Sequence, residues 1–279
     1  MEFKGRLIRK GKVKDIYEYS EDELLFFFTD RVSAFDVILP SMIPRKGEVL
    51  CKFAEYWFKT LGVKNHMVKV IGKNMMVVKK LNMIPIECIV RGYLYGSLYE
   101  RVKEGLASVP IEPVLAAKLP QPIFDPTTKY EEKDVPITKD EILRRGWLNE
   151  DEYEEVVEKS MMIYSKIAEK ADKAGFIVAD LKLEFGKKDG EILLADSIGP
   201  DEFRLWPKDK YEVGRAQESY DKQPIRDWLI KIGYKAKLDE AVKNKKPLPE
   251  PPQLPESLIQ ETIGRYIIAY ERITGLKFD

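Results

Sequence analysis

Histidine and cysteine are scarce in this 279-residue chain, and their scarcity excludes several kinds of active site. The single histidine cannot form a zinc site that needs two or more histidine ligands, and a Ser-His-Asp or Cys-His mechanism would depend on His66 alone. His66 follows a helix-stop signal at Gly62, so we expect it to be a structural residue in a surface turn. Cys51 and Cys88 form no spaced motif, which disfavours a disulfide framework and favours a reducing, cytoplasmic location.

Long apolar runs and a charge excess of either sign are also missing. The longest apolar cluster, residues 24–28, is far shorter than the ~20 residues that cross a bilayer, so we expect no membrane partner. The first residues are charged and carry no apolar core, so we expect no signal peptide. The 47 basic and 47 acidic side chains balance, so no global field attracts nucleic acid. Chemistry in this chain therefore depends on carboxylates, lysines and arginines, with oxygen as the ligand of any metal.

Hydrophobic periodicity predicts a chain of strands and helices, long enough for about two lobes. Strands are predicted at residues 3–10, 13–19, 24–28, 67–71, 75–81, 86–90, 176–185 and 191–195. Helices are predicted at residues 48–61, 97–104, 138–145, 149–174, 224–230 and 256–274. Loops are predicted at residues 30–46, 197–223 and in the proline-rich segment 106–137.

The predicted hairpin of residues 176–195 carries carboxylates. Asp180, Lys182 and Glu184 alternate with apolar residues, so they share one face of a strand. A two-residue turn would place Asp196 on the apolar face, whereas a three-residue bulged loop would pair it with Lys182. We predict the bulged loop, because it avoids burying a carboxylate among leucines. Glu184 and Asp196 then suit Mg²⁺, and a solvent-facing stripe of salt bridges is the alternative interpretation.

Two other segments have residues that suit anions. A glycine turn carries Lys12 and Lys14 and could fold over a triphosphate as kinase glycine loops do, although basic hairpins are common. Arg91 ends an apolar strand and is followed by two glycines and Ser97. Arginine supplies a planar fork and glycine lets backbone amides approach an anion, but a plain glycine-rich turn explains this second segment equally well.

Nine segments, taken in order, resemble the phosphoribosylaminoimidazole-succinocarboxamide synthase (SAICAR synthetase) family of purine biosynthesis. They are residues 11–17, 33–36, 45–47, 78–87, 90–97, 124–129, 180–186, 199–206 and 220–228. The resemblance implies an α+β fold of two lobes with mainly antiparallel sheets, flanking helices and a nucleotide cleft like that of kinases and ATP-grasp enzymes. It also implies a nucleotide-binding lobe at residues 1–84 and a larger substrate- and metal-binding lobe at residues 85–279.

The resemblance further implies an ATP-dependent ligase. Such an enzyme joins the imidazole carboxylate of CAIR (5-amino-1-(5-phospho-D-ribosyl)imidazole-4-carboxylate) to L-aspartate, giving SAICAR, ADP and phosphate. An acyl phosphate would supply the good leaving group that a carboxylate lacks, and the aspartate amine would then attack it. This chemistry needs positioning and charge neutralisation by cations rather than a histidine. The family also implies a homo-oligomer.

The resemblance assigns a role to each matching residue. The implied ATP ligands are Lys12, Lys14, Met83, Glu87 and Lys129. The implied Mg²⁺ ligands are Glu184 and Asp196. The implied substrate ligands are Ser33, Asp36, Arg91, Ser97, Asp201, Lys222 and Arg226. The residues implied at the reacting end of CAIR, and hence in catalysis, are Asp180, Lys182 and Arg204.

The sequence departs from the family pattern in three places. Ser197 stands where many members have a second acidic residue, and Lys133 stands where many have histidine. The segment 199–204 lacks the usual hydroxyl side chains. Two alternatives therefore stay open: another ATP-using ligase or small-molecule kinase on the same lobes, and a nucleotide-binding protein without turnover.

Overall fold

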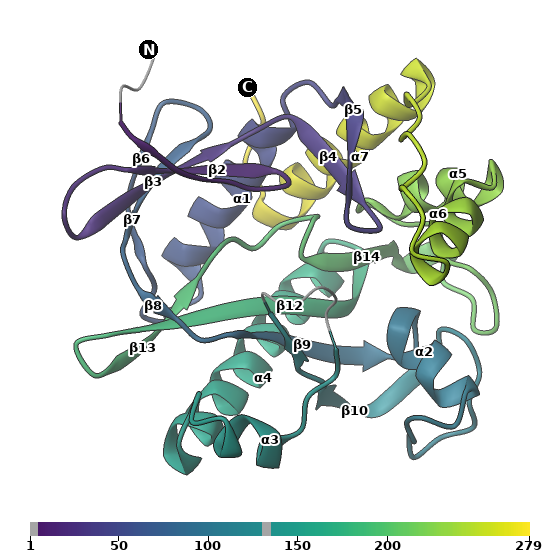
Figure 1. Cartoon of the computed structure of the whole chain (residues 1–279), viewed down its shortest axis with the longest axis horizontal. Helices are drawn as coiled ribbons and strands as arrows, with labels where there is room; N and C mark the ends of the chain where they lie inside the picture. Colours follow the sequence, from purple (N-terminus) through teal and green to yellow (C-terminus); the bar gives the residue numbers. More distant parts are fainter. Residues whose placement is uncertain (1–4, 130–134) are drawn as a thin grey trace. The chain divides into compact units, whose positions relative to one another are not determined.

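The computed structural model describes residues 5–129 and 135–279 (Figure 1). The chain has the predicted α+β fold, with antiparallel sheets and flanking helices. It divides into two compact units. Unit 1 comprises Met1–Tyr56, Met67–Lys79 and Ser219–Asp279, and unit 2 comprises Trp57–His66 and Lys80–Glu218. The predicted boundary at residue 84, with nucleotide bound by the first lobe and substrate and metal by the second, stays a prediction.

A five-stranded antiparallel sheet in the order β1-β2-β3-β7-β6 forms the centre of unit 1. Its strands are β1 (Leu7–Lys10), β2 (Lys14–Glu18), β3 (Glu23–Phe28), β6 (Met67–Ile71) and β7 (Met75–Lys79). The inner strands β3 and β7 have a neighbour on each side and carry fully buried residues such as Leu25 and Met76. All five strands lie in segments that the sequence predicts as strands, and the prediction errs only at their ends.

Unit 1 also contains a hairpin and three further helices. They are β4 (Arg31–Ala34), β5 (Val37–Met42), α5 (Gln223–Lys231), α6 (Tyr234–Lys243) and α7 (Glu256–Thr274). The hairpin lies in a segment predicted as loop, and that prediction is wrong. Its two-residue turn places Phe35 and Asp36 at φ 52° and 64°. Hairpin turns of this kind usually contain glycine or asparagine, so the usual sequence signal is missing.

The helix α1 (Lys46–Thr60) begins in unit 1 and ends in unit 2. Within unit 1, the ring of Phe53 on α1 meets Tyr270 of α7 edge-on, with ring centroids 5.2 Å apart. Gly62 follows the helix with φ 70°, in the left-handed conformation that commonly ends helices. The predicted helix and its stop signal are thus confirmed.

Unit 2 is built on a seven-stranded antiparallel sheet around the long strand β12 (Phe176–Lys188). The other strands are β8 (Asn82–Met83), β9 (Ile86–Tyr93), β10 (Lys118–Phe124), β11 (Thr127–Thr128), β13 (Glu191–Ala195) and β14 (Phe203–Pro207). The helices are α2 (Gly96–Lys103), α3 (Lys139–Arg144), α4 (Glu150–Lys173) and the short 3-10 helix η1 (Lys208–Lys210). The strands β10, β11 and β14 lie in segments predicted as loops, so the sequence pattern underestimates this sheet.

The helix α4 packs on β12 and β9, as Figure 1 shows. Asn149 caps its first turn in a capping box with Glu152, in which each side chain bonds the other's backbone amide at 2.9 Å. Gly175, at φ 79°, follows its last turn. Val156, Ile163 and Ile167 point to the sheet and are fully buried. The predicted boundaries of this helix are confirmed.

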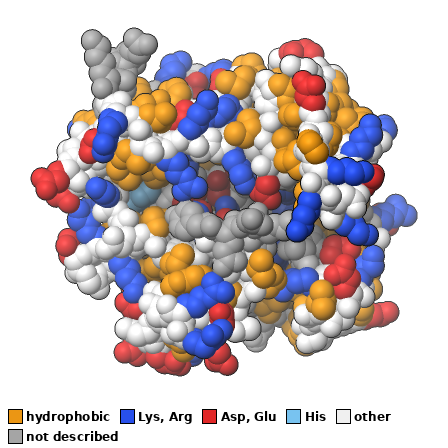
Figure 2. All heavy atoms as spheres, viewed as in Figure 1, with side chains coloured by type: hydrophobic (Ala, Val, Ile, Leu, Met, Phe, Trp, Pro, Cys, Tyr) orange, Lys and Arg blue, Asp and Glu red, His pale blue; other side chains and the backbone are white. Residues whose placement is uncertain are grey.

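The surface carries charges of both signs. The face drawn in Figure 2 shows lysine and arginine side chains interspersed with acidic and hydrophobic ones, in keeping with the formal net charge of zero. Over residues 5–129 and 135–279, none of the helices combines the length and the hydropathy that a bilayer crossing requires.

Candidate active site

A cluster of carboxylates and lysines lies on β9, β11 and β12 in unit 2. Lys182 Nζ donates to Glu87 Oε1 at 2.8 Å, and Lys129 forms an ion pair with Glu184. Thr127 Oγ1 donates to the other oxygen of Glu87 at 3.4 Å, because the two residues face each other across the β9–β11 ladder. Glu87 and Glu184 are 9% and 4% exposed. The polar stripe of β12 is therefore an internal ion-pair cluster and not a solvent-facing surface.

The hairpin that brings Asp196 to this cluster differs from the prediction. Glu184 pairs with Ala195, so the strands are joined by a two-residue turn at Asp189 and Gly190, both at positive φ. The prediction of a bulged loop is wrong. Asp196 still escapes the apolar face, because β13 ends at Ala195 and Asp196 itself takes φ 59°, which turns the chain out of the strand. The left-handed conformation of Asp196 thus keeps its carboxylate off the apolar face, as the bulged loop was expected to do.

The side chains of this cluster shift one another's pKa values through their charges. Burial, and next the charge of Asp196, raise the pKa of Glu184, and the nearby Lys129 and Lys182 only partly offset them. Burial alone would lower the pKa of Lys182, but Glu184, Glu87 and Asp196 together raise it well above its usual value. Lys182 is therefore a permanent cation near neutral pH and is unsuited to act as a general base.

The donor set of the cluster fits Mg²⁺. Three carboxylates and two lysines leave one negative charge in excess, and the raised pKa of Glu184 marks a buried carboxylate that a further cation would stabilise. Across the described parts of the chain, no three histidine, cysteine or acidic side chains are grouped to hold a metal by themselves. Mg²⁺ commonly takes one or two carboxylates and completes its shell with substrate phosphates and water. Glu184 and Asp196 are of the right type and number for that arrangement.

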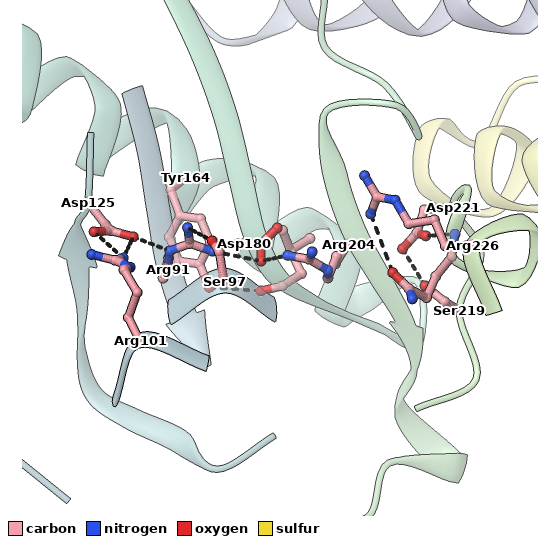
Figure 3. A network of polar contacts seen from close by, with 12 residues as sticks. Arg91, Ser97, Arg101, Asp125, Tyr164, Asp180, Arg204, Ser219, Asp221 and Arg226 are labelled. Atoms are coloured by element: carbon pink, nitrogen blue, oxygen red, sulfur yellow. Dashed lines mark hydrogen bonds and ion pairs between the residues drawn. The ribbon is translucent and has the colours of Figure 1, made fainter. Parts of the chain in front are cut away.

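A second polar network centres on Arg91, which is 3% exposed (Figure 3). Its guanidinium donates to Asp125 and, at 2.9 Å, to Ser97 Oγ, and it lies 3.5 Å from Asp180. Asp180 in turn accepts a hydrogen bond from Arg204. The strand register explains this order, because Asp180 lies opposite Arg91 on β9 and opposite Arg204 on β14. Two arginines therefore share one buried carboxylate.

Two glycines near this network leave space for large side chains that pack against their backbone. A Cβ at Gly96 would lie 2.7 Å from Arg204 Nη2, and Gly96 has φ 59°, so both space and conformation favour glycine there. A Cβ at Gly92 would lie 1.9 Å from the hydroxyl of Tyr164, which donates to the Val178 carbonyl at 2.8 Å. The two glycines of the predicted anion segment thus admit a guanidinium and a phenol.

In unit 1, the predicted phosphate ligand Lys12 forms an ion pair with the predicted substrate ligand Asp36. Lys14 Nζ lies over the ring of Phe26, 4.9 Å from its centroid. Ser33 is buried, on β4. Arg226 Nη1 donates to Gln223 Oε1 at 3.3 Å.

Asp221 stands beside the predicted ligand Lys222 at the start of α5. Figure 3 shows its carboxylate beside Ser219, whose hydroxyl donates to it. The backbone amide of Gln223 donates to the other oxygen at 2.6 Å. It thereby orders the turn that carries Lys222, which is the N-cap residue of α5.

The structure brings together some of the predicted site residues. Glu87, Lys129, Lys182, Glu184 and Asp196 form one cluster, and Arg91, Ser97, Asp180 and Arg204 form another. Met83 is half-buried on β8, opposite Gly186, and Asp201 is half-buried in the turn before β14. Lys12, Lys14, Ser33, Asp36, Lys222 and Arg226 belong to unit 1, so their convergence with the others on shared ligands stays a prediction.

The positions that depart from the family pattern have different outcomes. Ser197 is buried, and its hydroxyl donates to Glu202 Oε1 at 3.4 Å, so a serine here has a structural partner. Lys133 lies outside the described residues. His66 was expected on the surface, and that expectation is wrong. It is 2% exposed, with Nε2 at 3.2 Å from the backbone oxygen of Asp196.

Sequence reasoning missed two members of the Arg91 network. Asp125 accepts from Arg91 and also from Arg101 Nη2, at 2.7 Å through its Oδ1. Asp125 stands in one of the nine family-like segments, which was the available signal, but Arg101 has none beyond its place on a predicted helix. Asp125 holds the guanidinium of Arg91, and Arg101 in turn holds Asp125.

Comparison with known proteins adds an independent finding. Residues 7–242 match the SAICAR synthetase family model. A phosphoribosylaminoimidazole-succinocarboxamide synthase of Nitrosopumilus maritimus is 53% identical over 270 residues, which cover 96% of this chain and 98% of that protein. One of Thermodesulfovibrio yellowstonii is 40% identical over 97% of this chain and 96% of its own length.

Solved structures agree with these relatives. A SAICAR-synthase from Saccharomyces cerevisiae complexed with SAICAR is 36% identical, with a TM-score of 0.83 over 99% of this chain and 96% of its own. A SAICAR synthetase in complex with ADP is 28% identical, with a TM-score of 0.74 over 97% of this chain and 99% of its own.

Proposed function

The chain belongs to the SAICAR synthetase family, and from this premise we propose how its residues divide the work of the reaction. Members of the family use ATP to join CAIR and L-aspartate in purine biosynthesis, and this chain is such a ligase. Membership disfavours the alternatives of a different ligase, a small-molecule kinase or a nucleotide-binding protein without turnover. Mg²⁺, the site residues, a cytoplasmic location and a homo-oligomeric state are parts of the proposal.

The reaction proceeds in two displacements. A carboxylate oxygen of CAIR attacks the γ-phosphorus of ATP, the bond to the β-phosphate oxygen breaks, and ADP leaves an acyl phosphate. The neutral amine of L-aspartate then attacks the acyl carbon, inorganic phosphate departs, and the nitrogen loses one of its two protons, so that the amide keeps one N–H. In both steps negatively charged reactants must approach each other. The enzyme's task is therefore to position these reactants and to neutralise their negative charge.

The buried cluster around Lys182 is the observation that carries the assignment of roles. Lys182 is held protonated by Glu87, Glu184 and Asp196, so it serves as a fixed cation beside the CAIR carboxylate. Lys129, paired with Glu184, serves the ATP phosphates. Glu184 and Asp196 would hold Mg²⁺, which when bound would neutralise phosphate charge.

The Arg91 network binds the phosphorylated substrate. A guanidinium held by a buried carboxylate keeps its fork in one orientation, so Arg91 and Arg204 are preorganised for an anionic group of CAIR, with Ser97 as a further donor. The remaining assignments follow the family-like segments. They are Lys12, Lys14, Met83 and Glu87 for ATP, Asp180 for the imidazole end of CAIR, and Ser33, Asp36, Asp201, Lys222 and Arg226 for the substrates.

Release of ADP with CAIR, with and without L-aspartate, tests the proposed reaction. Release that depends on aspartate, together with formation of SAICAR, supports the ligase. Release with CAIR alone would indicate an uncoupled kinase, and no release with either substrate would refute turnover.

The variant Lys182→Met tests the fixed cation. It should lower turnover by about a hundredfold or more, because the cation that the buried carboxylates hold in place is removed. Lys173→Met is the matched control, since Lys173 forms an exposed ion pair within α4 and should keep full activity. Equal activity of the two variants would refute the role of Lys182.

A further inference from the structure

The turn between β1 and β2, residues Gly11 to Lys14, is tight. The Gly11 amide donates to the Lys14 carbonyl at 2.9 Å, and a Cβ at Gly11 would lie 2.4 Å from that oxygen. Only glycine fits at this position without a shift of the backbone. The turn presents Lys12, which is exposed, and Lys14, which is half-buried.

Arg31, the first residue of β4, grips this turn from one side. Its Nη2 donates to the Gly11 carbonyl at 2.9 Å, and its Nε donates to the Lys12 carbonyl at 3.4 Å. The same guanidinium forms a two-pronged ion pair with Asp15, at 3.0 and 2.6 Å. The side chains of Arg31 and Asp15 are only 14% and 11% exposed. Arg31 is thus fixed by Asp15 while it holds two successive carbonyls.

Thr29 holds the third carbonyl of the turn. Its hydroxyl and its backbone amide both donate to the Val13 carbonyl, at 2.7 and 3.0 Å. In a trans peptide the carbonyl and the following amide point in opposite directions. Capture of the Gly11 and Lys12 carbonyls by Arg31 therefore turns the amides of Lys12 and Val13 to the opposite side. Within residues 5–129 and 135–279 these two amides donate to no acceptor.

We propose that Arg31 is a positioning residue for the phosphates of ATP. It turns the carbonyls of Gly11 and Lys12 away from the ligand, and so presents the amides of Lys12 and Val13 together with the two lysines to an anion. Amides that point to a common side bind phosphate oxygens in other proteins. The inference rests on the proposed contact of Lys12 and Lys14 with the ATP phosphates, and it adds the residue that keeps their turn in the binding geometry.

Steady-state kinetics of Arg31→Lys tests the proposal. Lysine keeps the charge but cannot bond Asp15 and two carbonyls at once, so the KM for ATP should rise by about tenfold or more. The KM values for CAIR and L-aspartate should stay within about twofold, because the change is confined to the turn. Asp15→Asn should also raise the KM for ATP, since the guanidinium of Arg31 then loses its two-pronged ion pair. Arg6→Lys is the matched control on the same hairpin, where Arg6 forms an exposed ion pair with Glu18.

The lysine variants separate failure of this inference from failure of the proposed function. If Lys12→Ala and Lys14→Ala raise the KM for ATP while Arg31→Lys and Asp15→Asn do not, the positioning role is refuted and the phosphate role of the lysines stands. If neither lysine variant changes that KM, the phosphate role fails and the positioning role fails with it.

A combined variant distinguishes positioning from a general effect on folding. With both lysines already changed to alanine, Arg31→Lys should raise the KM for ATP by a smaller factor than in the parent enzyme, because only the two backbone amides are then left to lose their orientation. The same factor in both backgrounds would overturn the inference. Should Arg31→Lys fail to fold, Asp15→Asn in the two backgrounds gives the same comparison.

Discussion

Replacement of Gly92 by alanine should destabilise unit 2 where β9 meets α4. The added Cβ would lie 1.9 Å from the hydroxyl oxygen of Tyr164 and 2.9 Å from its Cζ, whereas real Cβ contacts essentially never fall below 3.0 Å. Tyr164 is 5% exposed and cannot swing into solvent without losing its place in the core. Its hydroxyl would also lose the Val178 carbonyl. The substitution therefore forces either the ring or the strand to move.

The cost follows from two effects. Overpacking of a buried site costs ~1–3 kcal/mol, and loss of a buried hydrogen bond costs a further ~1–3 kcal/mol. The free energy of unfolding should thus fall by about 4 kcal/mol. With an unfolding entropy of ~2.1 cal/mol/K per residue, this loss corresponds for 279 residues to a melting temperature lower by ~7 °C.

Thermal unfolding of a double-mutant cycle measures this cost. Tyr164→Phe removes the hydroxyl that the new methyl group would meet, so Gly92→Ala should cost at least ~2 kcal/mol less in that background. Gly264→Ala is the control, because nothing lies within 4 Å of its added Cβ. There the substitution should stabilise α7 by ~0.5–1 kcal/mol. A loss below ~2 °C for Gly92→Ala, or no rescue by phenylalanine, would refute the close approach.

Three further predictions concern charge and ionisation. Asp125→Asn removes the carboxylate that holds Arg91 and Arg101, and it should raise the KM for CAIR by about tenfold in steady-state assays with less effect on kcat. Glu184→Gln should lower turnover strongly, yet thermal scans without ligand should show no loss of stability. Because the pKa of Glu184 is raised in the folded state, the folded state loses stability as the pH rises above the pKa that this carboxyl has in the unfolded chain. Glutamine does not ionise, so it removes that loss. Cys51, whose pKa burial raises to about 12, should react with a thiol reagent at pH 8 only after unfolding, since about one thiol in ten thousand is ionised there.

Local patterns predict the elements whose stability is local. The capping box at Asn149 and the glycine at 175 set the ends of α4, and short apolar segments between polar turns identify the sheet of unit 1. The β4–β5 hairpin is missed because Phe35 and Asp36 adopt positive φ without a glycine. The prediction of the β12–β13 register is wrong for a related reason. The predicted register assumed that the strand continues regularly through Asp196, whereas Asp196 itself takes a left-handed conformation and ends the strand.

The site is predictable to the extent that its residues follow one strand. Asp180, Lys182 and Glu184 appear at once as an alternating stripe. Asp125 is separated from Arg91 by 34 residues, and Arg31 is separated from Asp15 by 16, so their pairing depends on strand register that alternation does not contain. The charge state of Lys182 likewise needs the burial and the neighbours that only the fold supplies.

The buried imidazole of His66 has a practical consequence. Its Nε2 faces the backbone oxygen of Asp196 at 3.2 Å, and its ring meets Phe58 edge-on with centroids 5.3 Å apart. Only a protonated nitrogen can bond a carbonyl oxygen, so the hydrogen belongs on Nε2. The chain has no other histidine, so its nuclear magnetic resonance spectrum contains one imidazole system that needs no assignment. The rarest side chain thereby becomes a built-in reporter for movement of the segment that carries Asp196.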